Sequence, residues 1–491
     1  MATELIKEPM SKVDTAWLHM EQPTNLMMIN GVIIMDEHLD YDRLLETIEQ
    51  RFLTFRRFRQ KVVDTARGAY WVIDEDFDIR CHVRRTALPG AADQDELELL
   101  VSQLASTPLD TSKPLWQFYV VENFVEGPVI LTRIHHCIAD GIALVQVFLS
   151  LTDPTPEGRP SAKKPEVWKK RRAEESRVFQ RLLDPAREGL DFATHLGARL
   201  VQEGSKMLEN PAIAGNYAKE AGEIVRELAH SLTLENDPIT RFKGQLGTRK
   251  RVAWAEPLPL DEVKAVSKAF GCTVNDVLIA AVTGAIREYM VSAGDDPDGL
   301  EDIRATVPVN LRPLEHAQEL GNHFGLVFLS LPLSMGNPLE RLYAVNDRMN
   351  ELKSSKQAAV TLGFLGALGM GPSAVQKPVL DMLSQKATAV LTNVPGPQQP
   401  LYLAGSQMKE MMFWVPQNGN IGLGISILSY NGKVFFGLIS DYRLVSEPSA
   451  IISRFKKEFE KLLYLGMMLP LEGRPGTETA ETLLKKSLDD N

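Results

Sequence analysis

The 491-residue chain has few cysteines, no basic excess and little sequence that could span a membrane, and each shortage excludes a class of protein. Its three cysteines, Cys81, Cys137 and Cys272, are odd in number and far apart, which fits a reducing cytoplasm rather than a disulfide framework. Acidic side chains outnumber basic ones by 64 to 54, and the net charge of −10 argues against a nucleic-acid partner.

Signatures of covalent catalysis, metal binding and export are also missing. We find no Gly-x-Ser-x-Gly turn of the kind that presents a nucleophilic serine between a strand and a helix. The histidines outside residues 135–136 show no zinc-type i, i+4 pairing with glutamate or cysteine, so no metal site is predicted. The charges of Glu4, Lys7 and Glu8 interrupt any apolar core of an export signal.

The most informative feature that is present is a pair of adjacent histidines, His135 and His136. The apolar, β-branched segment from Gly127 to Ile134 predicts a buried strand that ends at the pair. Apolar residues at helical spacing from Ile142 to Leu151 predict a helix after it. We therefore expect the histidines at a strand-to-helix junction, where side chains leave the core and face a cleft.

Two interpretations of the histidine pair are open at this point. Paired histidines on an apolar strand are often hydrogen-bonded core residues, but a short loop between strand and helix also suits a general base. Neighbouring side chains on an extended segment point to opposite sides, so only one of the two can be that base. The same alternation turns Cys137 away from the base, and we interpret it as a packing residue.

The run from His135 to Gly141 resembles the HHxxxDG signature of the CoA-dependent acyltransferase superfamily. The resemblance implies that His136 is the base and that His135 supports it. It also implies that Asp140 has a structural role, turned towards an arginine for which Arg59 is the candidate. Gly141 would leave a substrate tunnel open.

Further segments resemble one branch of that superfamily, the bacterial wax ester synthase/acyl-CoA:diacylglycerol acyltransferase family, and they occur in order along almost the whole chain. The matching segments are Met10–Trp17, Met27–Met35, Pro114–Trp116, Asn275–Asp276, Pro308–Arg312, Gly321–Gly325 and Leu391–Pro397.

The family resemblance implies an O-acyltransferase that moves a long-chain fatty acyl group from acyl-CoA to a fatty alcohol, to diacylglycerol, or to both. A neutral imidazole, with an unperturbed pKa of ~6.5, can accept the alcohol proton while the oxygen attacks the thioester, a contribution of about 10²- to 10⁴-fold. Both substrates would meet at His136 in a ternary complex. No acyl-enzyme and no cofactor would be required, since acyl-CoA is itself a substrate.

Other motif residues have two interpretations each. Asn275, at the start of an apolar helix, is either an N-cap or a group that orients the acyl carbonyl, and Asp276 beside it is a second candidate. Trp116 suits core packing better than substrate contact. Arg312 is a candidate for a CoA phosphate, although most single arginines at strand ends are solvated or paired at the surface.

The chain length is natural for two domains with strands and helices in alternation. We predict a mixed α/β fold, and the resemblance implies two chloramphenicol-acetyltransferase-like domains with a channel between them. A hairpin is predicted over 424–439 from its central Asn-Gly, followed by a covering helix. The expected divisions are a first domain over 1–153, a helical linker over 154–245, a second domain over 246–470 and a flexible tail over 471–491.

Two segments raise the question of lipid contact. Lys163–Lys164 and Lys169–Arg172 flank Trp168, a pattern that suits anionic lipid or CoA phosphates but also a solvated helix face. The uncharged run Ala358 to Val375 approaches membrane-spanning length, yet glycines and a proline interrupt it. We expect it to line a fatty-acid tunnel or to pack against helices. The protein is expected to be cytoplasmic, with peripheral contact to the inner membrane face or lipid droplets.

Two alternatives to this function follow from the same motif. Condensation domains of peptide synthetases share the histidine signature but use carrier-protein thioesters, whereas the other motifs here match the wax ester synthase branch. A non-catalytic lipid-binding protein could keep the fold, although intact His136, Asp140 and Gly141 favour an enzyme. Plant-type acyltransferases carry a DFGWG motif that this sequence lacks.

Overall fold

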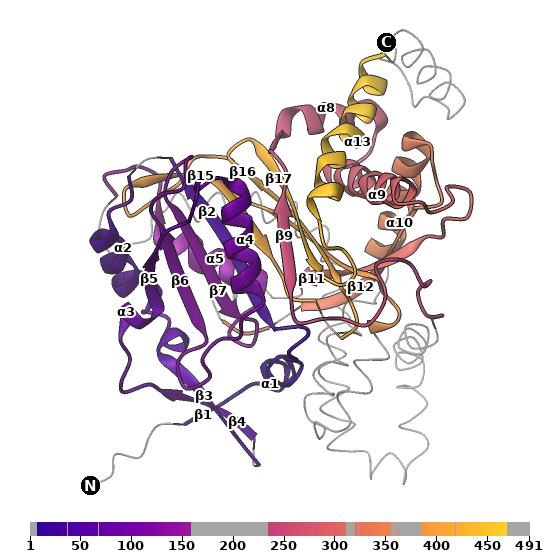
Figure 1. The fold of residues 1–491 in the computed structure, drawn as a ribbon. Coiled ribbons are helices and arrows are strands. Elements are labelled where there is room, and N and C mark those ends of the chain that lie inside the picture. Colours follow the sequence, from indigo (N-terminus) through magenta and orange to yellow (C-terminus); the bar gives the residue numbers. More distant parts are fainter. Residues whose placement is uncertain are drawn as a thin grey trace, which may run out of the picture.

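Two seven-stranded mixed sheets with flanking helices form the two halves of the molecule (Figure 1). This arrangement confirms the predicted mixed α/β fold with two sheets. The computed structural model describes residues 7–36, 38–66, 68–158, 234–310, 320–322, 324–354, 361, 384–417 and 419–468.

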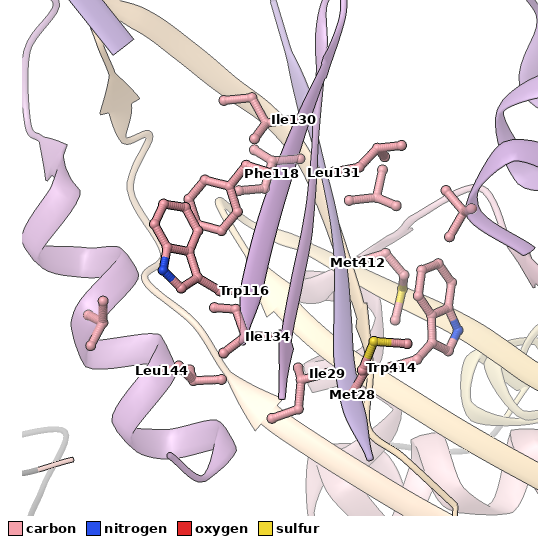
Figure 2. Close-up of a cluster of buried hydrophobic side chains, with 14 of the residues drawn as sticks. Met28, Ile29, Trp116, Phe118, Ile130, Leu131, Ile134, Leu144, Met412 and Trp414 are labelled. Atoms are coloured by element: carbon pink, nitrogen blue, oxygen red, sulfur yellow. The ribbon is translucent and has the colours of Figure 1, made fainter. Parts of the chain in front are cut away.

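The first sheet has the strand order β5-β6-β7-β2-β15-β14-β8. Its strand β7 is the predicted one and pairs with β6 and β2 on its two sides. Every residue of its VILTRIH sequence is buried, including the polar Thr132, Arg133 and His135, so both faces of the sheet are covered at this strand. Figure 2 shows the side chains packed on the two faces of this sheet. The strands are β2 (Met28–Met35), β5 (Val83–Thr86), β6 (Trp116–Val121), β7 (Val129–His135), β8 (Thr152–Asp153), β14 (Tyr402–Leu403) and β15 (Ser406–Trp414).

Strand β15 joins the first sheet although its sequence lies among the strands of the second. It pairs antiparallel with β2, with Met408 opposite Met35 and Trp414 opposite Asn30. Met412 and Trp414 are buried there against the first sheet (Figure 2). The sequence analysis predicts one domain over residues 246–470, whereas in the structure β15, which lies in that range, belongs to the first sheet. Strand pairing over such a separation leaves no local signal in the sequence, so this pairing could not be predicted.

The second sheet has the order β10-β17-β16-β13-β11-β12, with β9 also on β17. The predicted hairpin is confirmed as β16 and β17, and both residues of its turn, Asn431 and Gly432, have the positive φ angles of a type I′ turn. The strands are β9 (Lys250–Trp254), β10 (Leu258–Pro259), β11 (Ile303–Asn310), β12 (Phe324–Leu331), β13 (Ala389–Pro395), β16 (Leu423–Tyr430) and β17 (Lys433–Asp441).

Helices cover the sheets by burying apolar stripes. In the first half, α5 (Gly141–Leu151) places Leu144 against β6 and β7 (Figure 2). In the second half, α9 lies between α10 and α13, as Figure 1 shows, and the predicted covering helix is α13. Besides α5, the helices of the two halves are α2 (Tyr41–Thr47), continued by the π-turn η1 (Ile48–Phe52), α3 (Ile79–His82), α4 (Gln94–Ala105), α8 (Leu260–Phe270), α9 (Val274–Ser292), α10 (Pro338–Ser354) and α13 (Ser449–Met468).

A buried ion pair joins α10 to α13 inside the second half. Arg341 pairs with Glu458, and their side chains are 3% and 2% exposed. Gly284 of α9 makes room for them, since a Cβ at that position would lie 2.1 Å from Glu458 Oε2. The Nε and Nη1 of Arg341 also donate to the backbone carbonyls of Ala280 and Met335, so acceptors besides Glu458 stabilise the buried charge.

A small sheet and a short helix precede the first large sheet. Strands β1 (Glu8–Pro9), β4 (Gly68–Ile73) and β3 (Gln60–Thr65) pair antiparallel. Helix α1 (Lys12–His19) begins at its N-cap Ser11, whose hydroxyl accepts the amide hydrogen of Asp14. The 3-10 turn η2 (Arg56–Arg59) leads into β3.

Strand β9 crosses from the second half and binds side chains of α4 in the first. The amides of Lys250, Val252 and Trp254 donate to Ser106 Oγ, Ser102 Oγ and Glu98 Oε1 over 2.8, 3.0 and 3.1 Å. Residues four apart on a helix are separated by about 6 Å along its axis, which is close to the spacing of alternate residues on a strand. Side chains of the helix can therefore accept hydrogen bonds from successive outward-facing amides at this edge of β9.

This contact gives the protein a pH-dependent stability that Glu98→Gln should remove. Burial raises the pKa of Glu98 to about 7 from the ordinary 4.5. A folded pKa above the unfolded one means that the stability contribution is present at low pH and is lost as the pH rises through 7. A glutamine at position 98 keeps a side-chain oxygen that can accept the Trp254 amide hydrogen, but it carries no charge. We expect the variant to melt higher than the native protein at pH 8, with the difference vanishing towards pH 5.

Thermal unfolding followed by circular dichroism at pH 5, 6, 7 and 8 measures this difference. Glu49→Gln, at an exposed position, is the matched control and should show no such trend. An equal difference at every pH would contradict the assignment of the titration to Glu98.

Several predicted features lie outside the described residues or remain predictions. The basic segment 163–172, the tail 471–491, Arg312 and all of 358–375 except residue 361 are not described. Within the described ranges, no single helix is both long and apolar enough to span a membrane. Helices α8 and α9 reach that threshold only together, and a bend of 99° separates them.

Candidate active site

The two histidines lie where the sequence predicts them, at the junction of β7 and α5. His135 is the last residue of β7, and Asp140 is the N-cap of α5, with its Oδ1 accepting the Ala143 amide hydrogen over 2.8 Å. Both histidines are buried, His136 with 5% exposure. A Cβ at Gly141 would meet no atom of a described residue within 4 Å, and the tunnel expected beside it stays a prediction.

His136 is held on its backbone and on its ring. Its amide donates to Met27 O over 2.7 Å, and its carbonyl accepts from Asn322 Nδ2 over 2.9 Å. The imidazole stacks on Trp17 at 4.2 Å between ring centroids and lies 5.5 Å from Phe324. Burial lowers the pKa of His136 to about 4, against a smaller opposing effect of the Asp140 charge. The side chain is therefore a neutral imidazole at physiological pH.

His135 cannot serve as the base, because both of its ring nitrogens are engaged. Nδ1 accepts the amide hydrogen of Cys137 over 3.1 Å, which places the ring proton on Nε2. Nε2 then donates to Glu21 Oε2 at 3.0 Å. Burial raises the pKa of Glu21, but the interaction with His135, its hydrogen bond first, outweighs that effect, and the net pKa is lowered. His135 and Glu21 thus shape the turn that presents His136.

Glu21 reaches this turn by a second route as well. Its Oε2 also accepts the Met27 amide hydrogen over 3.1 Å, and the Met27 carbonyl accepts that of His136. Sequence analysis did not single out Glu21. Its only signal was a carboxylate between two matched segments, which says nothing of a partner more than one hundred residues away.

The second half of the chain also contacts the histidine loop. Asn322 Nδ2 binds His136 O and Asp14 Oδ1, the latter at 2.8 Å, and the Asn322 amide donates to the same Asp14 oxygen. The Asp140 amide donates to Gly321 O over 3.3 Å. The segments holding Asp14, Trp17 and Asn322 were recognised in the sequence, but without any role.

The expected pairing of Asp140 with Arg59 is not found between these two described residues. Arg59 is exposed on η2, whereas Asp140 is 3% exposed at the start of α5. The arginine of this turn that reaches inward is Arg57, whose Nη1 lies 4.0 Å from Asp14 Oδ2 and whose guanidinium stacks on Trp71. Arg57 is half-buried and Arg59 is exposed on the same turn, a difference that the resemblance alone could not resolve.

The residue that caps the helix beginning near Asn275–Asp276 is not the one that the sequence suggested. Thr273, not Asn275, is the N-cap of α9, and Asp276 completes a capping box by accepting the Thr273 amide hydrogen over 2.8 Å. Asp276 is fully buried and also accepts from Asn346 Nδ2 at 2.7 Å. These contacts give its carboxylate a structural role in the helix start, and its candidacy for substrate contact stays a prediction.

Asn275 is the other candidate of that pair. Its Oδ1 accepts from Asn393 Nδ2 over 2.6 Å, which joins two of the recognised segments. With the oxygen engaged, the Nδ2 group is the part of Asn275 that can donate to a carbonyl. Among the described residues, no contact links this pair to His136.

Trp116 is a core residue rather than a substrate contact. Its indole is fully buried in an aromatic cluster with Phe52 and Phe118, and Figure 2 shows it beside Phe118. Its Nε1 donates to Phe58 O over 2.8 Å. Cys137 is likewise fully buried, and burial raises the pKa of its thiol well above the ordinary value. It is a packing residue, not a thiolate. Within the described ranges, no group of three or more histidine, cysteine or acidic side chains could hold a metal ion.

Two sequence-family profiles match the chain, one after the other along the sequence. The profile "wax ester synthase/diacylglycerol acyltransferase catalytic domain" matches residues 10–278, and the profile "WS/DGAT C-terminal domain" matches residues 320–463. A curated relative from Mycobacterium tuberculosis, described as a probable diacylglycerol O-acyltransferase, is 27% identical over 446 residues, which cover 89% of this chain and 91% of the relative.

Solved structures share the fold. The wax ester synthase/diacylglycerol acyltransferase from Marinobacter aquaeolei VT8 superposes with a TM-score of 0.64 at 21% identity, covering 94% of this chain and all of that one. The first condensation domain of the calcium-dependent antibiotic synthetase superposes with a TM-score of 0.57 at 14% identity, covering 94% and 97%. At these identities the likeness concerns the fold alone.

Proposed function

The chain belongs to the wax ester synthase/diacylglycerol acyltransferase family, and we propose that it transfers a long-chain fatty acyl group from acyl-CoA to the hydroxyl of diacylglycerol, of a fatty alcohol, or of both. One observation carries the proposal: His136 is a buried, neutral imidazole held on ring and backbone by both halves of the chain. Such a group can accept a proton without first losing one.

In the proposed reaction, the hydroxyl oxygen attacks the thioester carbonyl while His136 accepts its proton. The C–O bond forms, the C–S bond breaks, and the imidazolium returns the proton to the departing thiolate, so that ester and CoA thiol are the products. With a pKa of about 4, His136 is too weak a base to deprotonate an alcohol beforehand, so proton transfer accompanies attack. Asn275 is the candidate donor to the carbonyl oxygen.

The acceptors are lipids that partition into membranes, and we extend the proposal to a cytoplasmic enzyme in peripheral contact with the inner membrane face or lipid inclusions. The position of Arg312 in a strand-end motif makes it a candidate for a CoA phosphate. Neither role is needed for the chemistry at His136.

The test is acceptor-dependent thiol release from palmitoyl-CoA by the full chain, with hexadecanol or dipalmitoylglycerol as acceptor and the ester identified by chromatography. Release with ester formation supports the proposal and ranks the acceptors. Release without ester would indicate a thioesterase. No release from the folded protein would overturn the proposal and favour carrier-protein donors or a lipid-binding role.

The pKa of His136 predicts an unusual pH profile for this reaction. The base acts in its neutral form, and a lowered pKa extends that form to lower pH. We expect kcat/KM to stay level below the value of ~6.5 at which an ordinary histidine titrates, and to fall only as the pH approaches about 4. Initial rates between pH 4.5 and 8, with folding checked at each pH, measure the profile. A half-maximal rate near pH 6.5 would contradict a buried base.

A further inference from the structure

We propose that Asn322 is a positioning residue for His136 and that Asp14 holds it in place, so that the second half of the chain fixes the backbone of the base in the first. The inference rests on the proposed function and adds to it a requirement for contact between the halves. Neither side chain needs to touch substrate for this role.

The hydrogen bonds settle the orientation of the Asn322 amide. Nδ2 is shared between two acceptors, Asp14 Oδ1 at 2.8 Å and His136 O at 2.9 Å. A flipped amide would direct an oxygen at a carboxylate and a carbonyl, neither of which can donate. Oδ1 of Asn322 is buried and makes no hydrogen bond to any described residue, so the amide acts here only as a donor.

Asp14 is held for this task from several sides. Its carboxylate is 3% exposed and accepts from both the side chain and the backbone amide of Asn322. Arg57, with its Nη1 4.0 Å from Oδ2, balances the buried charge. Burial raises the pKa of the Asp14 carboxyl, while the hydrogen bonds from Ser11 and Asn322 and the charge of Arg57 oppose that rise. In its carboxylate form Asp14 is a stronger acceptor for Asn322 than an amide partner would be.

The same helix secures the imidazole ring. Trp17 follows Asp14 by three residues, which places both side chains on one face of α1. Trp17 stacks on His136 with 17° between the planes, while Asn322 binds the carbonyl of the same residue. The peptide plane and the ring plane of His136 are therefore set together, the first through Asn322 and the second through Trp17.

Contact between Gly321 and the turn extends this support. Gly321 O accepts the Asp140 amide hydrogen, and Ala139 forms a parallel bridge with Gly321. Residues 321 and 322 thus contact both ends of the loop that carries His136. The placement of the base depends on a segment that precedes β12 of the second sheet.

An exchange of the two side chains separates positioning from simple docking of the halves. Asn322→Asp removes the donor to His136 and sets two carboxylates together. The double variant Asp14→Asn/Asn322→Asp restores a donor–acceptor pair between the two positions, but position 322 still offers no amide hydrogen to His136 O. Docking returns in the double variant and positioning does not.

The readouts are the melting temperature and the kcat and KM of acyl transfer by the full chain at pH 7.5. We expect Asn322→Asp to lower kcat about tenfold or more with a much smaller change in KM, since misplacing a reacting group acts on turnover. The exchanged pair should regain most of the lost melting temperature while kcat stays low. Asn322→Ala tests the same point if the aspartate variant fails to fold.

A matched control is available in the second half. Gln417 is 3% exposed and donates from Nε2 to Ile439 O, so Gln417→Glu removes a buried amide donor that contacts neither His136 nor Asn275 among the described residues. It should lower the melting temperature with kcat within about twofold of native. Recovery of kcat together with stability in the exchanged pair would overturn the inference, as would native kcat in folded Asn322→Ala. An inactive native protein would instead refute the proposed function.

Discussion

Replacing His136 with alanine is expected to lower kcat by about 10²- to 10⁴-fold, the contribution of a positioned general base. The substitution removes the only side chain in the loop placed to accept the hydroxyl proton, because both nitrogens of His135 are engaged. KM should change less, since a general base acts on the transition state more than on the binding of substrate. Steady-state rates with saturating palmitoyl-CoA and the preferred acceptor measure the loss.

A second buried histidine provides the matched control for this variant. His82 is 2% exposed and stacks on Trp116 at 4.5 Å, much as His136 stacks on Trp17, and burial lowers its pKa as well. His82→Ala should lower the melting temperature but leave kcat within about twofold of native. Activity within tenfold of native in folded His136→Ala would exclude His136 as the base.

The largest expected loss of stability comes from Arg341→Met. The substitution removes the guanidinium that pairs with buried Glu458, and Lys461 alone remains beside that carboxylate. Breaking a buried ion pair by removing one partner costs about 3–5 kcal/mol, and the remaining ion pair with Lys461, whose side chain is 38% exposed, offsets only part of that cost. We expect a large fall in the urea midpoint of unfolding, measured by tryptophan fluorescence.

The double variant Arg341→Met/Glu458→Leu separates the pair from the packing around it. With both charges removed, apolar side chains of similar volume can fill the space, and such replacements are often neutral or stabilising. We expect the double variant to regain much of the lost stability. If it is less stable than Arg341→Met alone, the stability lost in Arg341→Met comes from the missing backbone hydrogen bonds of Arg341 rather than from the buried Glu458 carboxylate.

Local patterns predicted the framework of the site. The strand before His135, the helix after Asp140 and the hairpin at Asn431–Gly432 follow from hydrophobic spacing and turn residues, and the structure confirms all three. The error at Asn275 was also local. Thr273 and Asp276 have the spacing of a capping box, a stronger signal than a lone asparagine.

The contacts that complete the site could not be predicted in this way. Asp14 and Asn322 are 308 residues apart, and no periodicity or turn signal relates them. Both residues lie in segments that resemble the family, but such a resemblance marks residues without showing which of them contact each other. Arg59 and Arg57 differ only in which way a short turn faces, and that is decided by packing against Trp71 and Asp14.

The exchange of β15 between the halves has a consequence for recombination and protein engineering. A fragment that ends before β9 would leave β2 as an open edge, with six residues that have lost their β15 partners, and such edges template aggregation. In chimeras between relatives, residues 402–414 belong with the first 158 residues, although they are encoded far downstream. A crossover between the two profile matches would therefore combine mismatched partners within one sheet, so functional chimeras require two exchanged blocks rather than one.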